Sequence, residues 1–369
     1  MKKYQTLPYI VRAVQTLCIN SLSYFFPRLT RLRGPFFLNW QISYACNARC
    51  GFCNTHELAK QTQEPIDPLK VVEQIDDFGI CHLSITGGEP FLGNTLKKIV
   101  DALEGKNIYI NVNTNGSLLH KHFDWLFDSC IDSLTISIDS ADPQKHDSNR
   151  SIKDLVATIK SASLIIKERR KKDKLKIVFR CVINRTNYLE LESMHRELLP
   201  YCDVMDFQPL HTTVFFDTAK TSETHLFCKQ ETPFDFRKED DASFSRTFAD
   251  FQQQDKRYQC SFYSGFRRFI FDPQKFSQNF TCYTSFSYLT ITPGGDVYPC
   301  TFMIDKVGSL AKAGLKEIWS SDAMNRIRKQ HKKKMPCFCW CGIAEINNLL
   351  SVKKYFDKTD GKDGNPVRS

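Results

Sequence analysis

The alternation of apolar runs with helical stretches constrains the fold of this chain more than any other feature. From residue 36 onward, six short apolar runs typical of buried strands are separated by segments whose apolar residues recur at helical spacing. Strands that alternate with helices pair in parallel, with the helices packed outside the sheet. Six such units can form an open sheet or a partial barrel, and the spacing alone does not choose between them. The strand-like runs are Phe37–Ile42, His82–Ile85, Ile108–Asn113, Ser133–Ile138, Ile177–Ile183 and Val204–Gln208, and the helical segments are Asp67–Phe78, Leu96–Leu103, Phe123–Asp128, Ile152–Arg169 and Leu189–Leu199.

The pattern divides the chain into five parts. Residues 1–35 predict one or two amphipathic helices bordered by basic side chains, and residues 36–210 carry the strand–helix repeats. Residues 211–280 are rich in aromatic side chains and predict no definite element. A compact cysteine-bearing region follows at 281–352, and the polar tail 353–369 is predicted to be disordered.

Composition limits the possible partners. The formal charge is +10, but no nucleic-acid-binding signature accompanies it, so we expect no nucleic-acid partner. No stretch of about 18 apolar residues exists, which predicts no membrane span. The N-terminal segment either packs on its own domain or makes a peripheral contact with a membrane surface. The chain is long, has fifteen cysteines and carries no secretory signal. These features favour a location in the reducing cytoplasm and cysteines that bind metal as thiolates, and they leave membrane association open.

Three of these cysteines lie close together directly after the first predicted strand. Cys46, Cys50 and Cys53 have the spacing Cys-x3-Cys-x2-Cys. A loop at the carboxyl end of a strand is where α/β proteins place cofactors. Three thiolates suit three corners of a four-iron cluster and leave one iron open to a small molecule, although a zinc site or buried free thiols would use the same residues.

This triplet, with Phe52 before its last cysteine, resembles the signature of the radical S-adenosylmethionine (SAM) superfamily. Later motifs occur in the order found in that family. Gly87, Gly88 and Glu89 resemble its Gly-Gly-Glu-Pro motif, in which the carboxylate receives the methionine amino group of SAM. The resemblance covers about residues 36–210 and implies a partial (β/α)6 barrel.

The same resemblance implies further SAM-binding residues on the following strand ends. These are Asn115 after the third strand, Ser137 and Asp139 at the end of the fourth, Arg150, which would pair with the SAM carboxylate, and Asn184 after the fifth. Each residue alone also fits a turn or a helix cap. Their occurrence in this order, on successive strand ends, is what supports the resemblance.

A second cysteine group occupies the C-terminal region. The spacing Cys282-x12-Gly-x4-Cys300 resembles the SPASM or Twitch extension of radical SAM enzymes, and the residues between form a predicted hairpin at a Pro-Gly-Gly turn. The remaining thiols, Cys337, Cys339 and Cys341, depart from the longer SPASM spacing. We therefore expect one auxiliary four-iron cluster, held by Cys282, Cys300 and two of these three, with zinc as the alternative.

The resemblance implies an enzyme that reductively cleaves SAM to a 5′-deoxyadenosyl radical and removes hydrogen from an unidentified substrate. Oxidation or another modification of a small molecule is the first expectation, and modification of a ribosomally made peptide is the second. A reducing partner such as flavodoxin or ferredoxin would supply the electron. A non-catalytic electron-transfer protein or a zinc-stabilised structural protein is the alternative outside the enzymes.

Overall fold

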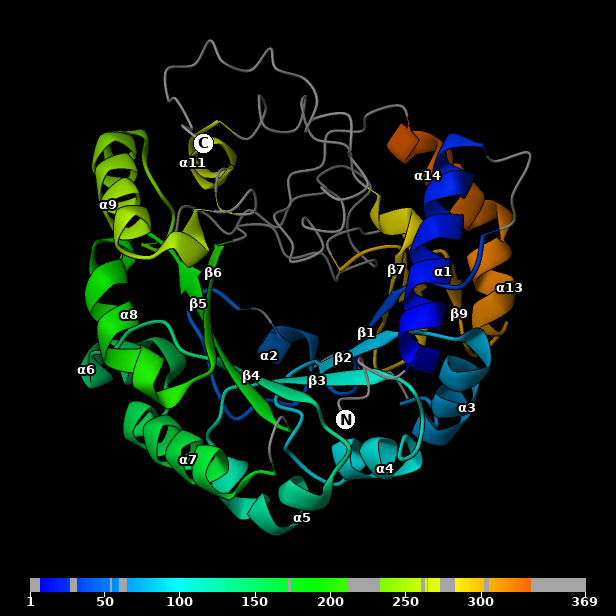
Figure 1. The fold of residues 1–369 in the computed structure, drawn as a ribbon, viewed down its shortest axis with the longest axis horizontal. Coiled ribbons are helices and arrows are strands. Elements are labelled where there is room, and N and C mark those ends of the chain that lie inside the picture. The colour runs from blue at the N-terminus through cyan, green and yellow to red at the C-terminus, as the bar shows by residue number, and fades with distance from the viewer. Residues whose placement is uncertain are drawn as a thin grey trace.

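A single curved sheet organises the chain. The computed structural model describes residues 7–26, 32–53, 55–59, 65–171, 174–210, 233–259, 263, 265–272, 283–301 and 305–332. Nine strands within these ranges form one sheet in the order β6-β5-β4-β3-β2-β1-β7-β8-β9 (Figure 1). The strands are β1 (Phe37–Gln41), β2 (His82–Thr86), β3 (Tyr109–Thr114), β4 (Ser133–Ser137), β5 (Lys176–Ile183), β6 (Val204–Pro209), β7 (Tyr288–Ile291), β8 (Asp296–Tyr298) and β9 (Gly308–Ser309).

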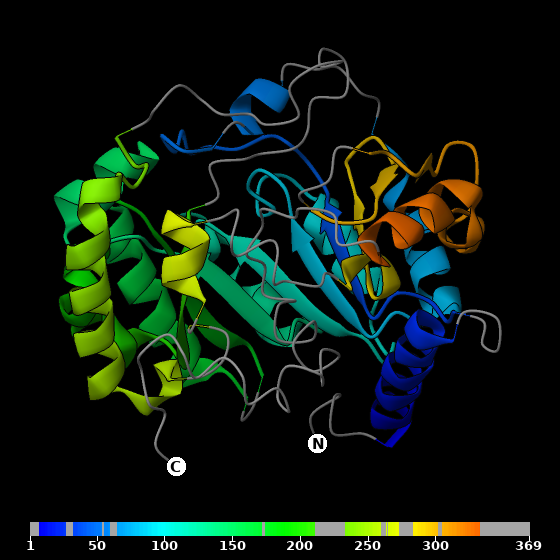
Figure 2. The ribbon, with the colours of Figure 1, turned by 90° about the horizontal axis from the view of Figure 1, so that it is seen from above.

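The first six strands lie side by side in chain order and pair in parallel. Helices connect them and cover the outer face of the sheet (Figures 1 and 2). The sheet curls, and because the end strands β6 and β9 do not pair it forms a partial barrel, as expected (Figure 1). The helices are α1 (Leu7–Phe25), α2 (Thr55–Leu58), α3 (Pro68–Phe78), α4 (Thr95–Ala102), α5 (Phe123–Asp128), α6 (Pro143–Arg150), α7 (Leu155–Arg169), α8 (Leu191–Leu198), α9 (Asp241–Gln254), α11 (Phe266–Phe271), α13 (Leu315–Ser320) and α14 (Asp322–Lys332).

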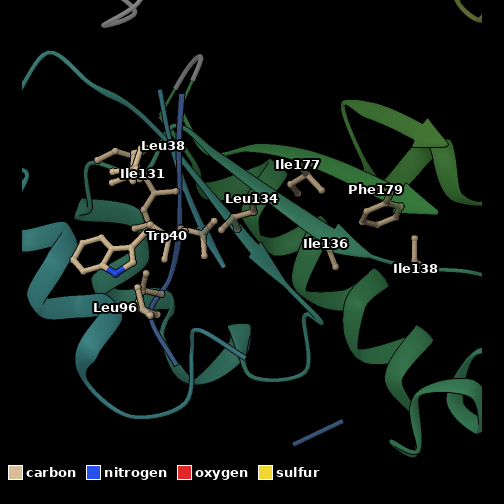
Figure 3. Close-up of a cluster of buried hydrophobic side chains, with 14 of the residues drawn as sticks. Leu38, Trp40, Leu96, Ile131, Leu134, Ile136, Ile138, Ile177 and Phe179 are labelled. Carbon is tan, nitrogen blue, oxygen red and sulfur yellow. The ribbon is translucent and has the colours of Figure 1, made fainter. Parts of the chain in front are cut away.

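The main core lies between the sheet and its outer helices. Alternate residues of each strand point outward and are fully buried, as Leu134, Ile136 and Phe179 illustrate (Figure 3). The strand residues between them face the inside of the barrel and include many polar side chains. This division explains why the strands read as apolar runs interrupted by Asn, Ser and Thr.

Local sequence signals set several helix boundaries. Asp67 caps α3 by accepting a hydrogen bond from the backbone N–H of Leu69, with Pro68 at the first helical position. Gly79 ends that helix in the left-handed conformation at φ +72°. Asp142 caps α6 in the same manner, followed by Pro143.

The predicted hairpin joins the main sheet. Its strands β7 and β8 pair antiparallel around a turn in which Gly295 has φ +81°, and β7 pairs in parallel with β1. One sheet therefore crosses residue 281, where the sequence pattern changes. The domain boundaries given above stay predictions.

The remaining sequence-based predictions agree with the structure to different degrees. The described part of 211–280 includes α9 and α11, helices that the sequence pattern did not indicate and that pack through Phe residues. Ile152 precedes the helix predicted from it, which begins at Leu155. The tail 353–369 lies outside the described residues. Of the helices in the described ranges, none has both the length and the apolarity needed to cross a membrane.

Candidate active site

The first cysteine loop leaves the carboxyl end of β1. Cys50 is buried, and Cys46 and Cys53 are half-buried. The loop backbone is fixed by the last turn of α6: the N–H of Arg49 donates to the carbonyl of Arg150 at 3.1 Å, and the N–H of Gly51 donates to the carbonyl of Asn149 at 3.2 Å. Carbonyls at a helix C-terminus have no partner inside the helix, so they are free to hold a loop in this way.

The paired glycines after β2 hold the other side of the loop. Gly88 donates its N–H to the carbonyl of Ser43 at 2.6 Å, and Glu89 donates its N–H to that of Ala45 at 2.8 Å. A Cβ at position 88 would lie 1.9 Å from the Ala45 oxygen, and one at 87 would lie 2.1 Å from the Ser43 oxygen. The loop can approach this closely only because both residues lack side chains.

Glu89 is almost fully buried, and its carboxylate accepts three hydrogen bonds. The backbone N–H of Asn115 donates at 2.7 Å, the hydroxyl of Thr114 at 2.7 Å and the backbone N–H of Phe91 at 3.1 Å. Burial raises the pKa of this carboxyl, and the three donors oppose the rise. An ionised carboxylate offers about four lone-pair sites, so one stays available to a ligand donor.

Asn115 connects the end of β3 to the cysteine loop. Its Nδ2 donates to Oδ1 of Asn47 at 2.9 Å, and Nδ2 of Asn47 donates to the hydroxyl of Ser117 at 2.9 Å. Asn47 lies between Cys46 and Cys50 in the sequence. The sequence analysis did not identify Asn47 or Ser117. Asn47 could have been found from the sequence, because it is a polar residue between two candidate cluster ligands.

A buried ion pair closes the opposite side. Arg150 donates from Nε at 2.9 Å and from Nη2 at 2.5 Å to Oδ2 of Asp139, which is fully buried. The backbone N–H of Val182 donates to Oδ1 of the same carboxylate at 3.1 Å. The Arg150 guanidinium also lies 5.7 Å from the centre of the Phe52 ring, within reach of a cation–π interaction. Arg150, which the resemblance assigned to the SAM carboxylate, is thus engaged with Asp139.

The remaining predicted residues follow β4 and β5. Ser137 is half-buried at the end of β4. Asn184 is buried, and its side chain bonds within its own loop, to Thr186 and to the carbonyl of Val182. Asn187 links two strand ends, because its Nδ2 donates to the carbonyls of Asp139 and Val182, each at 2.9 Å.

The sequence matches the model of the radical SAM superfamily over residues 40–198 and that of SPASM, an iron–sulfur cluster-binding domain, over residues 282–342. The chain belongs to the radical SAM superfamily. It is therefore an enzyme, and its cofactors are SAM and iron–sulfur clusters. Its second match makes it a radical SAM enzyme with a SPASM domain.

Curated relatives match over a shorter stretch. The chain is 31% identical over 109 residues to a probable GTP 3′,8-cyclase of Methanococcus maripaludis, covering 28% of this chain and 37% of that protein. It is 35% identical over 105 residues to a probable GTP 3′,8-cyclase of Sulfolobus acidocaldarius, covering 28% and 34%. The chain thus spans about a third of the length of these relatives.

Solved structures agree with the fold over more of the chain. SuiB of Streptococcus suis with bound S-adenosylmethionine has a TM-score of 0.57 at 17% identity, covering 80% of this chain and 68% of that one. The enzyme anSMEcpe with bound AdoMet and the Kp18Cys peptide has a TM-score of 0.59 at 17% identity, covering 80% and 83%. At these identities the likeness concerns the fold.

The loop of this radical SAM enzyme has donor chemistry that fits a cluster. Burial raises the pKa of Cys46, and it raises the pKa of Cys50 to about 11, while Arg150 acts in the opposite direction on both thiols. Buried thiols of this kind ionise when a metal compensates the charge. The N–H of Ala48 donates to the sulfur of Cys46 at 3.4 Å. As they stand in the described ranges, no three His, Cys, Asp or Glu side chains are gathered closely enough to hold a single metal ion.

The auxiliary site is described only in part. Cys300 is buried, whereas Cys282, Cys337, Cys339 and Cys341 lie outside the described residues. Arg328 of α14 is buried in the SPASM region, where it stacks 4.3 Å from the centre of the Trp319 ring and donates to the carbonyl of Ser285 at 3.0 Å. Its Nη2 has no hydrogen-bond partner among the described residues, and burial lowers the pKa of the guanidinium to about 9. A buried cation with an unpaired donor suits a negatively charged neighbour.

The inner face of the barrel is polar. Asn113 donates to the hydroxyl of Ser84 at 2.8 Å, and Asn111 accepts from the hydroxyls of Ser133 and Thr135 at 2.7 and 2.9 Å. The inner-facing residues on neighbouring strands also include Asn39, Gln41, Arg180 and Asp206. Arg180 pairs with Asp206 at 2.8 Å, and the hydroxyl of Tyr263 donates to the same carboxylate at 3.1 Å. Oε1 of Gln41 is buried and has no hydrogen-bond partner in the part of the chain that the structure describes.

Proposed function

We propose that this radical SAM enzyme cleaves SAM reductively at a four-iron cluster held by Cys46, Cys50 and Cys53 and removes a hydrogen atom from a polar small molecule. When bound, the reduced cluster supplies the electron that breaks a carbon–sulfur bond of SAM, and a 5′-deoxyadenosyl radical results. The observation that carries the proposal is the hydrogen-bonded frame around the cysteine loop. Three separate strand ends and the last turn of α6 contribute to it, through Gly88, Asn115, Asp139 and Arg150.

The predicted SAM residues divide into two roles. Glu89 retains acceptor capacity beside the loop, and Ser137 is half-buried at a strand end, so we assign both to contact with SAM. The other members are Gly87, Gly88, Asn115, Asp139, Arg150 and Asn184. Gly87 lies against the backbone of Ser43, and the polar atoms of the others bond to the protein itself. This supports a positioning role for all six: they hold the backbone that carries the cysteines and Glu89.

The auxiliary cluster is assigned to Cys300, Cys282 and two of Cys337, Cys339 and Cys341. The buried Arg328 guanidinium supports an anionic group in this region. A four-iron cluster with four thiolates carries net negative charge, because the thiolate charges exceed those of the iron–sulfur core. Such a cluster would accept or relay an electron during turnover. An external donor such as flavodoxin or ferredoxin would reduce the first cluster.

The barrel interior supports a polar substrate. Amide and hydroxyl groups line it, and the Arg180–Asp206 pair with Tyr263 adds charge at the far wall. A lipid-like substrate would cover these polar groups with apolar surface and offer no donor to the unpaired Oε1 of Gln41, which costs free energy. Peptide modification is the second candidate, supported by two solved structures of similar fold that hold peptides, SuiB bound to its precursor peptide SuiA and anSMEcpe with the Kp18Cys peptide.

Anaerobic reconstitution with iron and sulfide tests the first step. The reduced protein should convert SAM to 5′-deoxyadenosine, Cys50→Ala should abolish this, and Cys130→Ala on the outer side should not. Glu89→Gln should raise the KM for SAM while the cluster still forms. A fully loaded protein that makes no 5′-deoxyadenosine, or a Cys50→Ala variant with wild-type yield, would refute the proposed chemistry.

The substrate class can be tested without knowing the substrate. Small-molecule and peptide fractions from cells grown in deuterium oxide are supplied separately, and deuterium in the recovered 5′-deoxyadenosine is measured by mass spectrometry. Transfer from the small-molecule fraction supports the first candidate, and transfer from the peptide fraction alone supports the second. Arg180→Met should reduce the transferred deuterium and leave cluster content unchanged.

A further inference from the structure

The N-terminal helix α1 exposes most of its large aliphatic side chains. On its inner face Thr16, Asn20 and Ser23 are buried together with Tyr9, which packs against Phe36. Asn20 fixes the helix by donating to the carbonyl of Gly34 at 3.0 Å and accepting from the N–H of Arg33 at 3.1 Å. The apolar residues that the sequence pattern placed on one helix face point to solvent instead, apart from the half-buried Leu17.

The exposed face of α1 forms a continuous apolar stripe. It consists of Leu7, Pro8, Ile10, Val11, Val14, Cys18, Leu22, Phe25 and the adjoining Phe26. Leu7 is 72% exposed, Val14 53% and Phe25 58%. In the described part of the chain, twelve large apolar side chains are exposed, and seven of them belong to this stripe. Such concentration on one helix marks an interaction surface rather than scattered surface residues.

The charged residues of the N-terminal sequence are all basic. The sequence has no Asp or Glu before Glu57, whereas Lys2, Lys3, Arg12, Arg28, Arg31 and Arg33 lie within its first 34 residues. Arg33 is exposed beside the stripe, where its Nη1 donates to Oε1 of Gln15 at 2.7 Å. Gln15 is the polar exception among the exposed residues of α1.

A second basic segment lies next to the C-terminal end of α1. The ammonium of Lys332 in α14 is 5.0 Å from the centre of the Tyr24 ring, and Figure 1 shows α14 beside α1. Arg326 and Lys329 are exposed on the same helix. The packing therefore places a cation from the C-terminal region beside the C-terminal end of α1.

We propose that α1 lies on the surface of an anionic phospholipid bilayer, with its apolar stripe among the acyl chains and the surrounding cations on the headgroups. An apolar face bordered by Lys and Arg, without an acidic residue, is the pattern of an interfacial helix. A protein partner for so basic a border would have to supply an acidic rim, whereas a bilayer rich in anionic lipid supplies the charge over the whole surface. The polar face already bonded to the barrel allows docking without unfolding of α1.

Co-sedimentation of the reconstituted full chain with vesicles tests this proposal. We expect binding to vesicles of mixed phosphatidylglycerol and phosphatidylcholine, weaker binding to pure phosphatidylcholine, and release by high salt. Val14→Asp/Phe25→Asp should weaken binding about tenfold or more, because two apolar anchors are lost. The matched control is Leu164→Asp/Leu189→Asp, which changes the charge equally at positions that are 51% and 65% exposed and should bind as wild type does.

Melting temperature and iron content verify that each variant is folded, and Val14→Gln/Phe25→Gln replaces the first variant if it is not. Failure of the wild-type protein to bind anionic vesicles would overturn the proposal, and so would equal losses in the stripe and control variants. Light scattering covers the remaining case: a wild-type oligomer that the stripe substitutions dissociate would assign the stripe to a second copy of the chain. Cleavage of SAM should be the same in all variants, so this proposal and the proposed function fail separately.

Discussion

Substitution of Gly88 by alanine is the sharpest test of how the cysteine loop is held. The added Cβ would lie 1.9 Å from the carbonyl oxygen of Ala45 and 2.8 Å from that of Tyr44. A carbon–oxygen contact needs about 3.2 Å, so the backbone just before Cys46 must move by roughly 1 Å. Metal–ligand distances tolerate about 0.2 Å.

The cost follows from the kind of atoms in contact. Overpacking costs about 1–3 kcal/mol, and the upper end applies here because backbone must yield rather than a flexible side chain. The N–H of Glu89 would also lose its bond to the Ala45 carbonyl, worth about 1 kcal/mol. We expect an apo protein destabilised by about 3–4 kcal/mol that folds but loads little iron.

The assay is iron and sulfide per chain after reconstitution, absorption near 400 nm and urea unfolding of the apo protein. Gly105→Ala is the matched control, since Gly105 has φ +78° but no atom within 4 Å of an added Cβ. That variant should lose about 1 kcal/mol from backbone strain and keep its cluster. Wild-type iron content in Gly88→Ala would refute the reasoning, because the loop would then not depend on the glycine for its position.

Three further predictions concern the frame around the loop. Arg150→Met leaves the buried carboxylate of Asp139 without its partner and should lower the free energy of unfolding in urea by about 3–5 kcal/mol. Adding Asp139→Asn should recover most of this loss. A loss below about 1 kcal/mol would contradict the importance of the ion pair. Burial lowers the pKa of His146 to about 4 in the folded chain. The pKa of His146 in the unfolded chain is about 6.5, so its contribution to the free energy of unfolding should be complete above pH 6.5 and fall by about 3 kcal/mol as the pH drops to 4. His146→Gln should flatten this pH dependence of the unfolding free energy, and an unchanged dependence would argue against the role of His146. Asn47→Ala removes two hydrogen bonds between the loop and β3 and should cost about 1–3 kcal/mol in unfolding of the apo protein, with reduced iron content; no change in either measurement would exclude an anchoring role.

The repeats of the sequence predicted the parallel pairing of the first six strands and the position of the cysteine loop, and the family resemblance added the partial barrel. Parallel strands connected by helices have few arrangements, and motifs on successive strand ends must meet at one edge. The partners of individual side chains did not follow from sequence, because they depend on contacts between residues far apart. The engagement of Arg150 with Asp139 and of Asn47 with Asn115 are examples.

Helix α1 shows a different limit. Its apolar spacing correctly predicted a helix, but the sequence left open whether the apolar face packs on the domain or meets a membrane surface. The hydrogen bonds of Asn20 with Gly34 and Arg33 fix the orientation of the helix. In 211–280, the Phe residues of α9 repeat at positions 244, 248 and 251, a helical spacing that the surrounding polar composition obscured.

The central place of β1 has a consequence for synthesis of the chain. This strand is flanked by β2 and β7, and Trp40 pairs across to Ile291, so one edge of β1 stays unpaired until about 250 more residues have been translated. At about 5–20 residues per second, that interval is roughly 10–50 s. An open strand edge invites pairing with another chain throughout that time. Nascent protein should therefore depend on ribosome-associated chaperones, and yield in a recombinant host should improve when translation is fast or when such chaperones are abundant.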